Sequence, residues 1–546
     1  MAAEKPEQTP TQTPTESSDP PATADQQPLD RVVFGVGAAA VLAVVAWGAF
    51  GKDSLDRAST SGLGWVLHNF GWLFVAAADA FLVLAVVIAC SRYGRIRLGA
   101  DSDRPEFSTL AWVAMMFSAG MGIGLMFYGV GEPLLHYAAP PPGSGVAPQT
   151  SAAAQTALEY ALFHWTLHPW AIYGVGGLAL AYSTFRKGRG NRISSAFVPL
   201  LGESRVAGWP GRAIDLLSVF ATVFGSATSL GLGALQVSQG LGVITSIRDT
   251  QGVQLVIIGA LTAAFVVSAF SGVHRGVKWL STGNIILAAV IMIFVFVVGP
   301  TVYVLDAIPG AVGGYLSDLL VMATRTSAFT DSAWLGSWTV FYWAWWLSWA
   351  PFVGTFIARI SRGRTVRQFL VGVLLVPSGA TVLWFCVMGG SAIRLDATGQ
   401  AKLVAKAVDQ GAEAALFGLL KALPLGSIST VVAVILVMTY FVTSADSASL
   451  VLGSLSQGGS LHPRTWLTVS WGLLMGAVAA VLLVAGGLAA LQRATILVAL
   501  PFVLVMLALC VALLKELRSD PSMLRDDDGT GSRPTPAARR QPRTRV

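Results

Sequence analysis

Long apolar segments separated by short polar ones make up most of the chain. Each is about 20 residues or longer, which is enough to cross the hydrocarbon layer of a bilayer as a helix. The segments lie at 32–50, 68–90, 109–138, 153–184, 213–237, 252–271, 280–306, 334–358, 366–388, 427–456, 465–487 and 490–514. They predict an all-α membrane protein with twelve transmembrane helices.

The composition agrees with this prediction. Hydrophobic residues make up 54% of the chain and charged residues 12%, whereas about a quarter of an ordinary soluble domain is charged. The continuous apolar runs also exclude a β-barrel, whose strands alternate in polarity and are about ten residues long. Cys90, Cys386 and Cys510 lie in or beside apolar runs and give neither a disulfide framework nor a metal-ligand spacing. We therefore expect no redox or zinc chemistry.

Polar segments flank the predicted twelve-helix domain of residues 32–514. Residues 1–31 are rich in proline and acids and lack the basic start and apolar core of a signal peptide, so we expect a retained, disordered tail. Residues 515–546 form a short tail that carries five arginines and no acid from Arg533 onward. Such a tail either lies against anionic membrane lipid or is simply solvated.

Basic residues are concentrated in the connections that follow the even-numbered segments. These connections contain SRYGRIR, FRKGRGNR, HRGVK, RISRGRTVR and HPR, whereas the opposite connection at 139–152 has no Lys or Arg. Because Lys and Arg are enriched in cytoplasmic loops, both termini are predicted to be cytoplasmic. The longer connections at 307–333 and 389–426 mix apolar and charged residues and are predicted to be amphipathic helices at the outer interface.

Glycine clusters occur in the third and fifth segments, as AGMGIG at 119–124 and GSATSLGLG at 225–233. A helix broken at membrane depth exposes backbone groups, and this is tolerated only where they face protein, water or a solute. A half-helix N-terminus can then receive a carboxylate, and freed carbonyls can bind a hard cation. A seam of small residues for helix packing is the competing interpretation.

The eighth segment contains a cluster of tryptophans in SWTVFYWAWWLSWAPFVGTF. Trp345, Trp346 and Trp349 lie near its middle, and Trp345 and Trp349 share one helical face. Core packing is one explanation for buried tryptophans. A binding site for a quaternary ammonium group is the other, because that group has no N–H to donate and is held chiefly by π faces.

A second aromatic set occurs in the fourth segment, where HWTLHPWAIY contains Trp165, Trp170 and Tyr173. Pro169 is predicted to break the helix there. Aromatic side chains from the fourth and eighth segments can then face each other and form a box around a cation. A kinked packing helix is the alternative.

Hydroxyl groups are the candidate ligands for a hard cation in these apolar segments. The candidates are Thr443 and Ser444 in the tenth segment and Thr222 and Ser226 in the fifth. Isolated Ser and Thr in membrane helices usually bond their own backbone or a neighbouring helix. Asp79 and Asp446 also fall within predicted spans, where acids are functional candidates by default, although a structural role would explain Asp446 equally well.

Three motifs reveal a family resemblance. FSAGMGIGLMFYGVGEPLLHY at 117–137, HWTLHPWAIY at 164–173 and WTVFYWAWWLSWAPFVGTFIARISRGRTVRQF at 338–369 closely resemble the betaine/choline/carnitine transporter family. The likeness covers about residues 30 to 515. It implies a LeuT-type core of two inverted five-helix repeats, segments 3–7 and 8–12, after two extra N-terminal helices, with alternating access around a midplane site. It also implies a homotrimer, with 307–333 as an interface helix.

The resemblance also assigns site residues. It implies an aromatic box made by Trp165, Trp170, Tyr173 and Trp346. It implies that Trp345 and Trp349 line the central substrate position, and that the unwound stretch with Ala119, Met121, Gly122 and Gly124 approaches a substrate carboxylate. One Na⁺ would lie at Ser118, Met121, Thr443 and Ser444, and a second at Thr222, Ser226 and Phe352.

The glycine motif bears on the coupling ion. GMGIG is similar to the motif of sodium/betaine symporters, whereas an Asp at the position of Gly124 marks proton-coupled choline carriers. The resemblance therefore implies symport of Na⁺ with glycine betaine or a related trimethylammonium compatible solute, with no cofactor, no catalytic residues and no nucleic-acid partner. Sodium-independent or proton-coupled choline or carnitine transport or exchange is the alternative. A channel or a membrane enzyme is the alternative from a different class.

Overall fold

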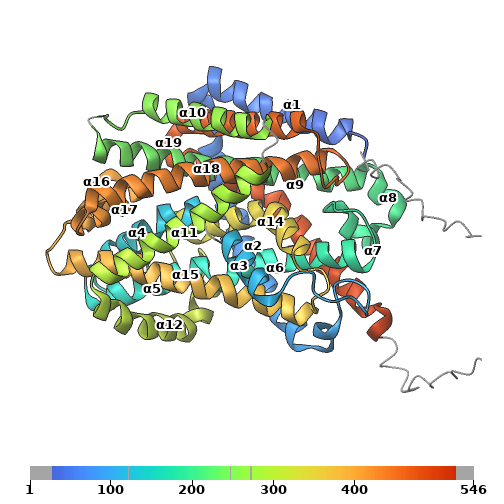
Figure 1. Cartoon of the computed structure of the whole chain (residues 1–546), viewed down its shortest axis with the longest axis horizontal. Coiled ribbons are helices and arrows are strands. Elements are labelled where there is room, and N and C mark those ends of the chain that lie inside the picture. Colours follow the sequence, from blue (N-terminus) through green and yellow to red (C-terminus); the bar gives the residue numbers. More distant parts are fainter. Residues whose placement is uncertain (1–26, 121, 246, 271–273, 524–546) are drawn as a thin grey trace, which may run out of the picture.

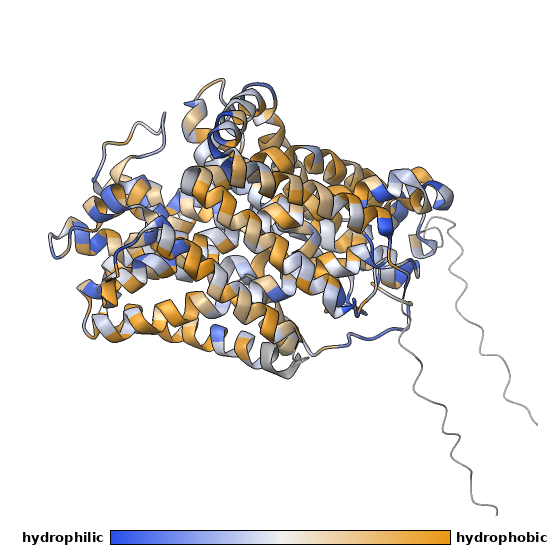
Figure 2. Ribbon diagram, turned by 90° about the horizontal axis from the view of Figure 1, so that it is seen from above, coloured by the Kyte–Doolittle hydropathy of each residue, from blue (hydrophilic) through white to orange (hydrophobic). Residues whose placement is uncertain are grey.

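The computed structural model describes residues 27–120, 122–245, 247–270 and 274–523, without the side chains of 117–120 and 274–278. Regular structure in these residues is helical, apart from one isolated β-bridge between Arg97 and Thr365. The long helices lie side by side, many of them along the long axis of the molecule (Figure 1). Apolar residues line the helices, and hydrophilic residues gather at their ends (Figure 2). The chain is therefore an all-helical membrane protein.

Nine helices in the described residues are long and apolar enough to cross a membrane. They are, or lie within, α1 (Arg31–Phe50), α2 (Lys52–Cys90), α9 (Trp209–Ile244), α10 (Gln251–Phe270), α11 (His274–Val298), α12 (Thr301–Ala323), α15 (Val366–Ala397), α18 (Gly426–Ser456) and α19 (Thr465–Arg518). α19 contains two helices that meet at a kink with non-helical backbone at Gly486 and Gly487. This kink separates the two predicted segments 465–487 and 490–514.

Three further predicted segments are built from shorter helices. The third consists of α3 (Thr109–Gly120) and α4 (Ile123–Ala138), and the fourth of α5 (Ser151–Trp165), α6 (Leu167–Ala181) and the π-helical turn η2 (Tyr182–Arg186). The eighth consists of α13 (Ser332–Leu335), the π-helical turn η4 (Gly336–Val340) and α14 (Phe341–Arg359). The helix break predicted around the AGMGIG motif is therefore present between α3 and α4.

The break in the fourth segment is not where the sequence predicts it. The backbone leaves the helical region at Thr166, with φ −112° and ψ −108°, and Pro169 lies inside the first turn of α6. Proline has no N–H, and its ring clashes with the carbonyl four residues earlier, which here belongs to Trp165. The distortion therefore precedes Pro169 by three residues and separates Trp165 from Trp170.

The fifth segment is not broken. α9 runs continuously for 36 residues through GSATSLGLG. Its glycines serve close packing instead, because an added Cβ would lie 2.6 Å from Ser348 at Gly225 and 2.4 Å from Leu491 at Gly231. The helix-packing alternative is therefore correct for this cluster.

Two predicted boundaries also change. The seventh segment was expected at 280–306, but α11 ends at Val298, and Pro300, which lacks an N–H, precedes the new helix α12. The expected interface helix at 307–333 corresponds to α12, which ends at Ala323. In the connection at 389–426, α15 continues to Ala397 and is followed by α16 (Leu403–Gln410) and α17 (Ala412–Ala422).

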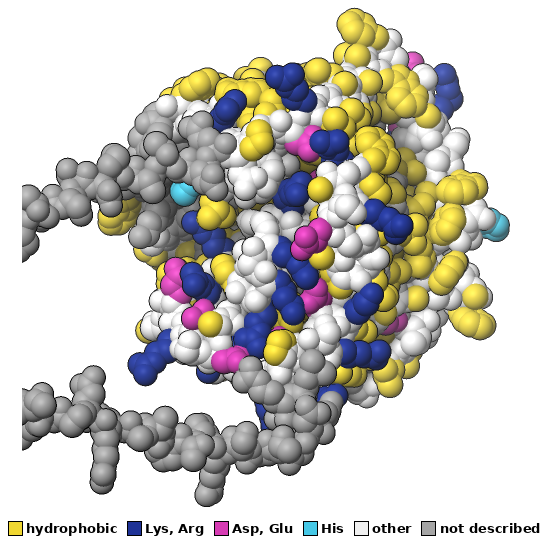
Figure 3. Space-filling view, turned by 90° about the vertical axis from the view of Figure 1, so that its right-hand side faces the viewer, with side chains coloured by type: hydrophobic (Ala, Val, Ile, Leu, Met, Phe, Trp, Pro, Cys, Tyr) yellow, Lys and Arg dark blue, Asp and Glu magenta, His cyan; other side chains and the backbone are white. Residues whose placement is uncertain are grey.

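Arginine-rich loops meet at one end of the helix array, which we call the basic face (Figure 3). Arg97 donates a hydrogen bond to the Gly363 carbonyl at 2.8 Å, and Arg367 donates to the Ala89 carbonyl at 2.7 Å. These contacts join the loops that contain SRYGRIR and RISRGRTVR on one side, as the charge pattern predicts. The side chains of HRGVK fall outside the described residues. The start of α1 and the end of α19 lie on the same side (Figure 1).

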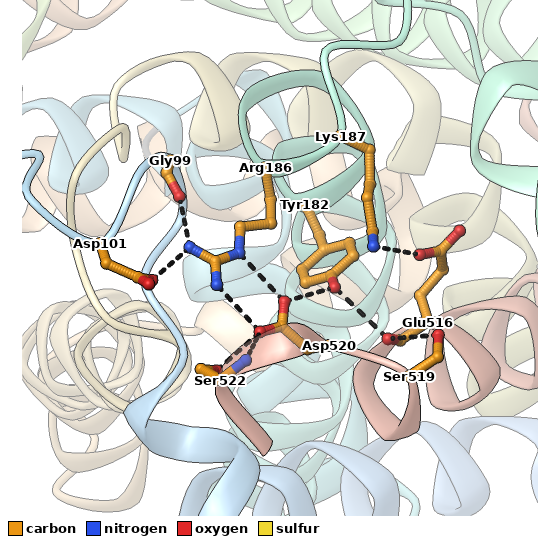
Figure 4. Close-up of polar contacts among 9 residues, drawn as sticks. All are labelled: Gly99, Asp101, Tyr182, Arg186, Lys187, Glu516, Ser519, Asp520 and Ser522. Carbon is orange, nitrogen blue, oxygen red and sulfur yellow. Dashed lines mark hydrogen bonds and ion pairs between the residues drawn. The ribbon is translucent and has the colours of Figure 1, made fainter. Parts of the chain in front are cut away.

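The end of α19 is fixed to the basic face by a buried ion pair (Figure 4). Arg186 donates from Nη2 and Nε to the two carboxylate oxygens of Asp520 at 2.9 and 3.0 Å, and the Tyr182 hydroxyl donates to the same carboxylate at 2.7 Å. Burial alone would raise the pKa of Asp520, but the hydrogen bonds from Arg186, Ser522 and Tyr182 outweigh it and hold that pKa below the usual range.

Asp520→Asn is expected to lower the midpoint of thermal unfolding of the solubilised protein, because Arg186 loses its buried anion and keeps only the exposed carboxylate of Asp101. The free energy of unfolding should fall by about 3 kcal/mol. Since the pKa of Asp520 is lowered by folding, its stabilisation is complete above the ordinary aspartate pKa of about 4 and is lost as the pH falls further. The difference between wild type and variant should therefore be constant from pH 8 to pH 5.

Asp101→Asn is the matched control. Asp101 pairs with the same Arg186 at 2.5 Å, but its side chain is 57% exposed, so its removal should cost less than about 1 kcal/mol. Equal shifts for the two variants would contradict the assignment of the stabilising pair to Asp520.

Candidate functional site

A cavity of about 450 Å³ lies among the helices and is lined by residues of α4, α5, α6, α9, α11, α14, α15 and α18. Its walls are largely aromatic, with hydroxyl and amide groups at intervals. It also reaches Arg359 at the end of α14 and the loop residues Asn191, Ser460 and Pro463. Asn191 follows η2 and the basic residues Arg186, Lys187 and Arg189, so the cavity extends toward the basic face.

All six aromatic residues predicted for solute binding line this cavity. They are Trp165, Trp170, Tyr173, Trp345, Trp346 and Trp349. Trp165 and Trp346 meet edge to face, with ring centroids 4.8 Å apart and an interplanar angle of 79°. Tyr173 is also nearly perpendicular to Trp346, at 6.1 Å and 84°. The break at Thr166 and the continuous helix α14 thus bring the two aromatic sets together.

Hydrogen bonds fix three of these indoles. Their acceptors are Glu132 for Trp165 at 2.8 Å, the His164 carbonyl for Trp346 at 3.0 Å, and the Ser229 hydroxyl for Trp345 at 3.2 Å. By contrast, the buried Nε1 of Trp349 has no acceptor among the described residues. Trp349 itself lines the cavity.

The gap between α3 and α4 forms another part of the wall. Gly122 is extended, with φ −166° and ψ −172°, and it and Gly124 line the cavity. The first-turn N–H groups of α4 lack intrahelical acceptors and carry the positive end of the helix dipole, which suits a carboxylate. Met121 lies outside the described residues. For Ser118 and Ala119 only the helical backbone of α3 is described.

Two of the predicted cation ligands lie at the cavity. Thr443 and Ser444 of α18 both line it. The Thr443 hydroxyl donates to the Thr439 carbonyl at 3.0 Å and accepts from Asn284 Nδ2 at 3.2 Å. The oxygen of the same side-chain amide, Asn284 Oδ1, is buried and has no partner among the described residues. Oxygen atoms of α11 and α18 therefore lie along the cavity wall.

The second predicted cation set is only partly brought together. Phe352 lines the cavity, whereas Thr222 and Ser226 are buried in α9 and do not line it. Thr222 donates to the Ser218 carbonyl at 2.8 Å, as isolated membrane hydroxyls usually do. Gly225, between Thr222 and Ser226, packs against Ser348 and Trp349 of α14, so this part of α9 lies at the α9–α14 contact.

Several polar residues of the site were not predicted. Asn284, Ser229 and Tyr440 line the cavity, and Glu132 lies directly behind it. An amide and an acid within apolar segments are signals that the sequence does carry, because such groups are costly in a membrane unless they have partners. The same rule drew attention to Asp79 and Asp446, and neither is among the residues described along the cavity.

Comparisons with known proteins agree with this architecture. Residues 32–522 match the model of the BCCT family, described as betaine/carnitine/choline family transporter. The chain is 45% identical over 491 residues to the glycine betaine transporter OpuD of Bacillus subtilis, which covers 89% of this chain and 94% of that protein. It is 42% identical over 503 residues to the betaine/ectoine transporter LcoP of Corynebacterium glutamicum, covering 91% of this chain and 79% of that protein.

A third relative is the ectoine/hydroxyectoine transporter of Virgibacillus pantothenticus, which is 38% identical over 489 residues, or 90% of this chain and 97% of that protein. The matches extend over nearly the whole helical domain and confirm the family predicted from the three motifs. The chain belongs to the betaine/carnitine/choline family of transporters and is a multi-pass membrane transporter, not an enzyme.

Proposed function

We propose that this protein is a sodium-coupled symporter of glycine betaine or a closely related trimethylammonium compatible solute. The observation that carries the proposal is the set of six aromatic side chains along one cavity. A trimethylammonium group is permanently charged and has no N–H, so π faces in a water-poor site are its natural partners. Among the relatives, OpuD is named a glycine betaine transporter and LcoP a betaine/ectoine transporter.

The rest of the cavity suits the other end of such a zwitterion. A carboxylate can accept from the first-turn N–H groups of α4, near Gly122 and Gly124, and from the indole N–H of Trp349. The solute would then span the space between the break in the third segment and the Trp165–Trp346 pair. Glycine betaine, a small zwitterion, fits a cavity of about 450 Å³ with room for water.

Sodium coupling rests on the oxygen atoms of α11 and α18 along the cavity. We assign one Na⁺ to Thr443 and Ser444 together with the backbone of the stretch that contains Ser118 and Met121, and a second to Thr222, Ser226 and Phe352. Gly124 offers no carboxylate, which argues against the proton-coupled alternative. Each Na⁺ that enters down a membrane potential of about 100 mV contributes about 2.3 kcal/mol to solute accumulation.

The cavity also suggests how transport proceeds. We assign the basic face to the cytoplasm, which makes both termini cytoplasmic and the present conformation inward-facing. Alternating access would involve two inverted repeats of the LeuT type, segments 3–7 and 8–12. We also propose a homotrimer in which α12 lies at the interface, and α12 has exposed apolar side chains at Val302, Leu316 and Leu320.

The coupling proposal predicts that purified protein in proteoliposomes takes up ²²Na⁺ and labelled glycine betaine together. Betaine uptake should rise steeply with external Na⁺ and should vanish when K⁺ replaces it. A panel with choline, carnitine and ectoine as competitors identifies the preferred solute. Betaine uptake that is indifferent to Na⁺ would contradict the coupling.

Trp349→Leu is expected to weaken betaine uptake at least tenfold in apparent affinity, because it removes one π face and the free indole N–H together. The measurement is the concentration dependence of uptake in the same vesicles. Trp72→Leu is the control, since Trp72 is 54% exposed on α2 and does not line the cavity. Similar affinities for the two variants would argue against the proposed site.

The two cavity glycines should differ in their tolerance of a methyl group. A Cβ at Gly124 would lie 2.6 Å from Trp345 and 2.8 Å from Trp165, whereas a Cβ at Gly122 meets nothing within 4 Å. Gly124→Ala should therefore lower betaine affinity more than tenfold, and Gly122→Ala should change it by less than about threefold. The reverse order would show that the indoles do not close on Gly124 when solute binds.

A further inference from the structure

A buried carboxylate lies directly behind the aromatic box. Glu132 is on α4, about two turns after Gly124, and is fully buried without lining the cavity. Its Oε2 accepts hydrogen bonds from Trp165 Nε1 at 2.8 Å and from the Tyr342 hydroxyl at 2.5 Å. Because Trp165 does line the cavity, a single indole ring separates this carboxylate from a bound solute.

Two histidines complete the surroundings of Glu132. His164 Nδ1 lies 2.7 Å and His136 Nε2 3.4 Å from its Oε1, and His164 Nε2 lies 3.0 Å from the Thr339 hydroxyl. No Lys or Arg in the described chain forms a hydrogen bond or ion pair with Glu132. Each neighbour can donate a hydrogen bond to the carboxylate, so the arrangement suits its ionised form.

A metal site is the other chemistry that these three residues suggest. Glu132, His136 and His164 present ligand atoms within 4.8 Å of one another. However, His164 Nδ1 and Glu132 Oε1 are only 2.7 Å apart, in direct hydrogen-bond contact. Ligands placed about 2.0 Å from a tetrahedral zinc ion would lie about 3.3 Å apart. The cluster is therefore a closed hydrogen-bond network.

The network holds both walls of the box. Trp165 is bonded to Glu132 directly, and its neighbour His164 is bonded to the same carboxylate through Nδ1. The His164 carbonyl in turn accepts the indole N–H of Trp346 at 3.0 Å. Trp165 and Trp346, which meet edge to face, are thus held by Glu132 and by a residue bonded to Glu132.

We propose that Glu132 is a positioning residue that makes the aromatic box selective for a positively charged head group. The proposal rests on the proposed function, since it requires an onium group in the box. Donation of the indole N–H to a carboxylate polarises the ring and makes its π face more negative. The charge of Glu132 also attracts a cation across the poorly screened interior. A neutral group of the same shape gains from neither effect.

The test is competition against labelled glycine betaine in proteoliposomes. The two competitors are unlabelled glycine betaine and 3,3-dimethylbutyrate, which has a neutral tert-butyl group in place of trimethylammonium. Glu132→Gln keeps the size of the side chain and one acceptor oxygen but removes the charge. The quantity compared is the inhibition constant of 3,3-dimethylbutyrate divided by that of glycine betaine. Glu132→Gln should lower this ratio about tenfold, because betaine binds more weakly and the neutral analogue is nearly unaffected. Equal weakening of both competitors would overturn the proposal.

Ser229→Ala is the matched control, because Ser229 is the uncharged acceptor for the N–H of Trp345, another indole of the cavity. It should leave the ratio at its wild-type value. A fall equal to that of Glu132→Gln would show that any lost indole acceptor acts alike and would overturn the role of charge.

Trp165→Phe keeps an aromatic ring but breaks its link to Glu132, and it provides the test if Glu132→Gln does not insert or fold. The ratio should fall, because the hydrogen bond that polarises the indole ring is lost. An unchanged ratio in Trp165→Phe would overturn the proposal. Wild-type protein that fails to discriminate between the two competitors would instead refute the binding of an onium group, and with it the proposed function.

Discussion

The edge-to-face contact between Trp165 and Trp346 is the interaction on which the rest of the site depends. It joins the broken fourth segment to the continuous helix α14, with ring centroids 4.8 Å apart. The contact requires close packing of α6 against α14, where a Cβ at Gly177 would lie only 2.7 Å from Ile357 and 3.1 Å from the Gly354 carbonyl. Two glycines on facing helices therefore allow the backbones to approach, and the indoles above them then meet across the cavity.

Burying indoles in a membrane creates a second requirement, because each N–H needs an acceptor. The protein meets it with a carboxylate, a backbone carbonyl and a hydroxyl for Trp165, Trp346 and Trp345. Only the first of these is charged, and within the described residues it forms no hydrogen bond or ion pair with an arginine or lysine. The polar groups that orient the aromatic walls thus also set the electrostatic character of the cavity. In our proposal the same polar residues therefore orient the indole rings and contribute to solute selectivity.

The sequence predicts those parts of the molecule that follow from length, apolar content and residue type. These parts are the apolar segments, the break at AGMGIG, the position of the arginine-rich loops on one side, and the two aromatic sets. Features that depend on neighbours in space were less predictable. Glycines in α9 resemble those between α3 and α4, but they face Ser348 and Leu491 and so serve packing. Pro169 indicated a break but not its position at Thr166, because the steric clash acts one turn earlier. Glu132 went unnoticed because nothing in its own segment shows that Trp165, Tyr342 and His164 surround it.

A density map of the purified protein with glycine betaine and NaCl would test the central claim most directly. Our account predicts solute density in the cavity of about 450 Å³, with the trimethylammonium end against the faces of the indoles at Trp165 and Trp346 and the carboxylate end toward Gly122. Solute density elsewhere in the protein, with these rings packed face against face and no space between them, would contradict it.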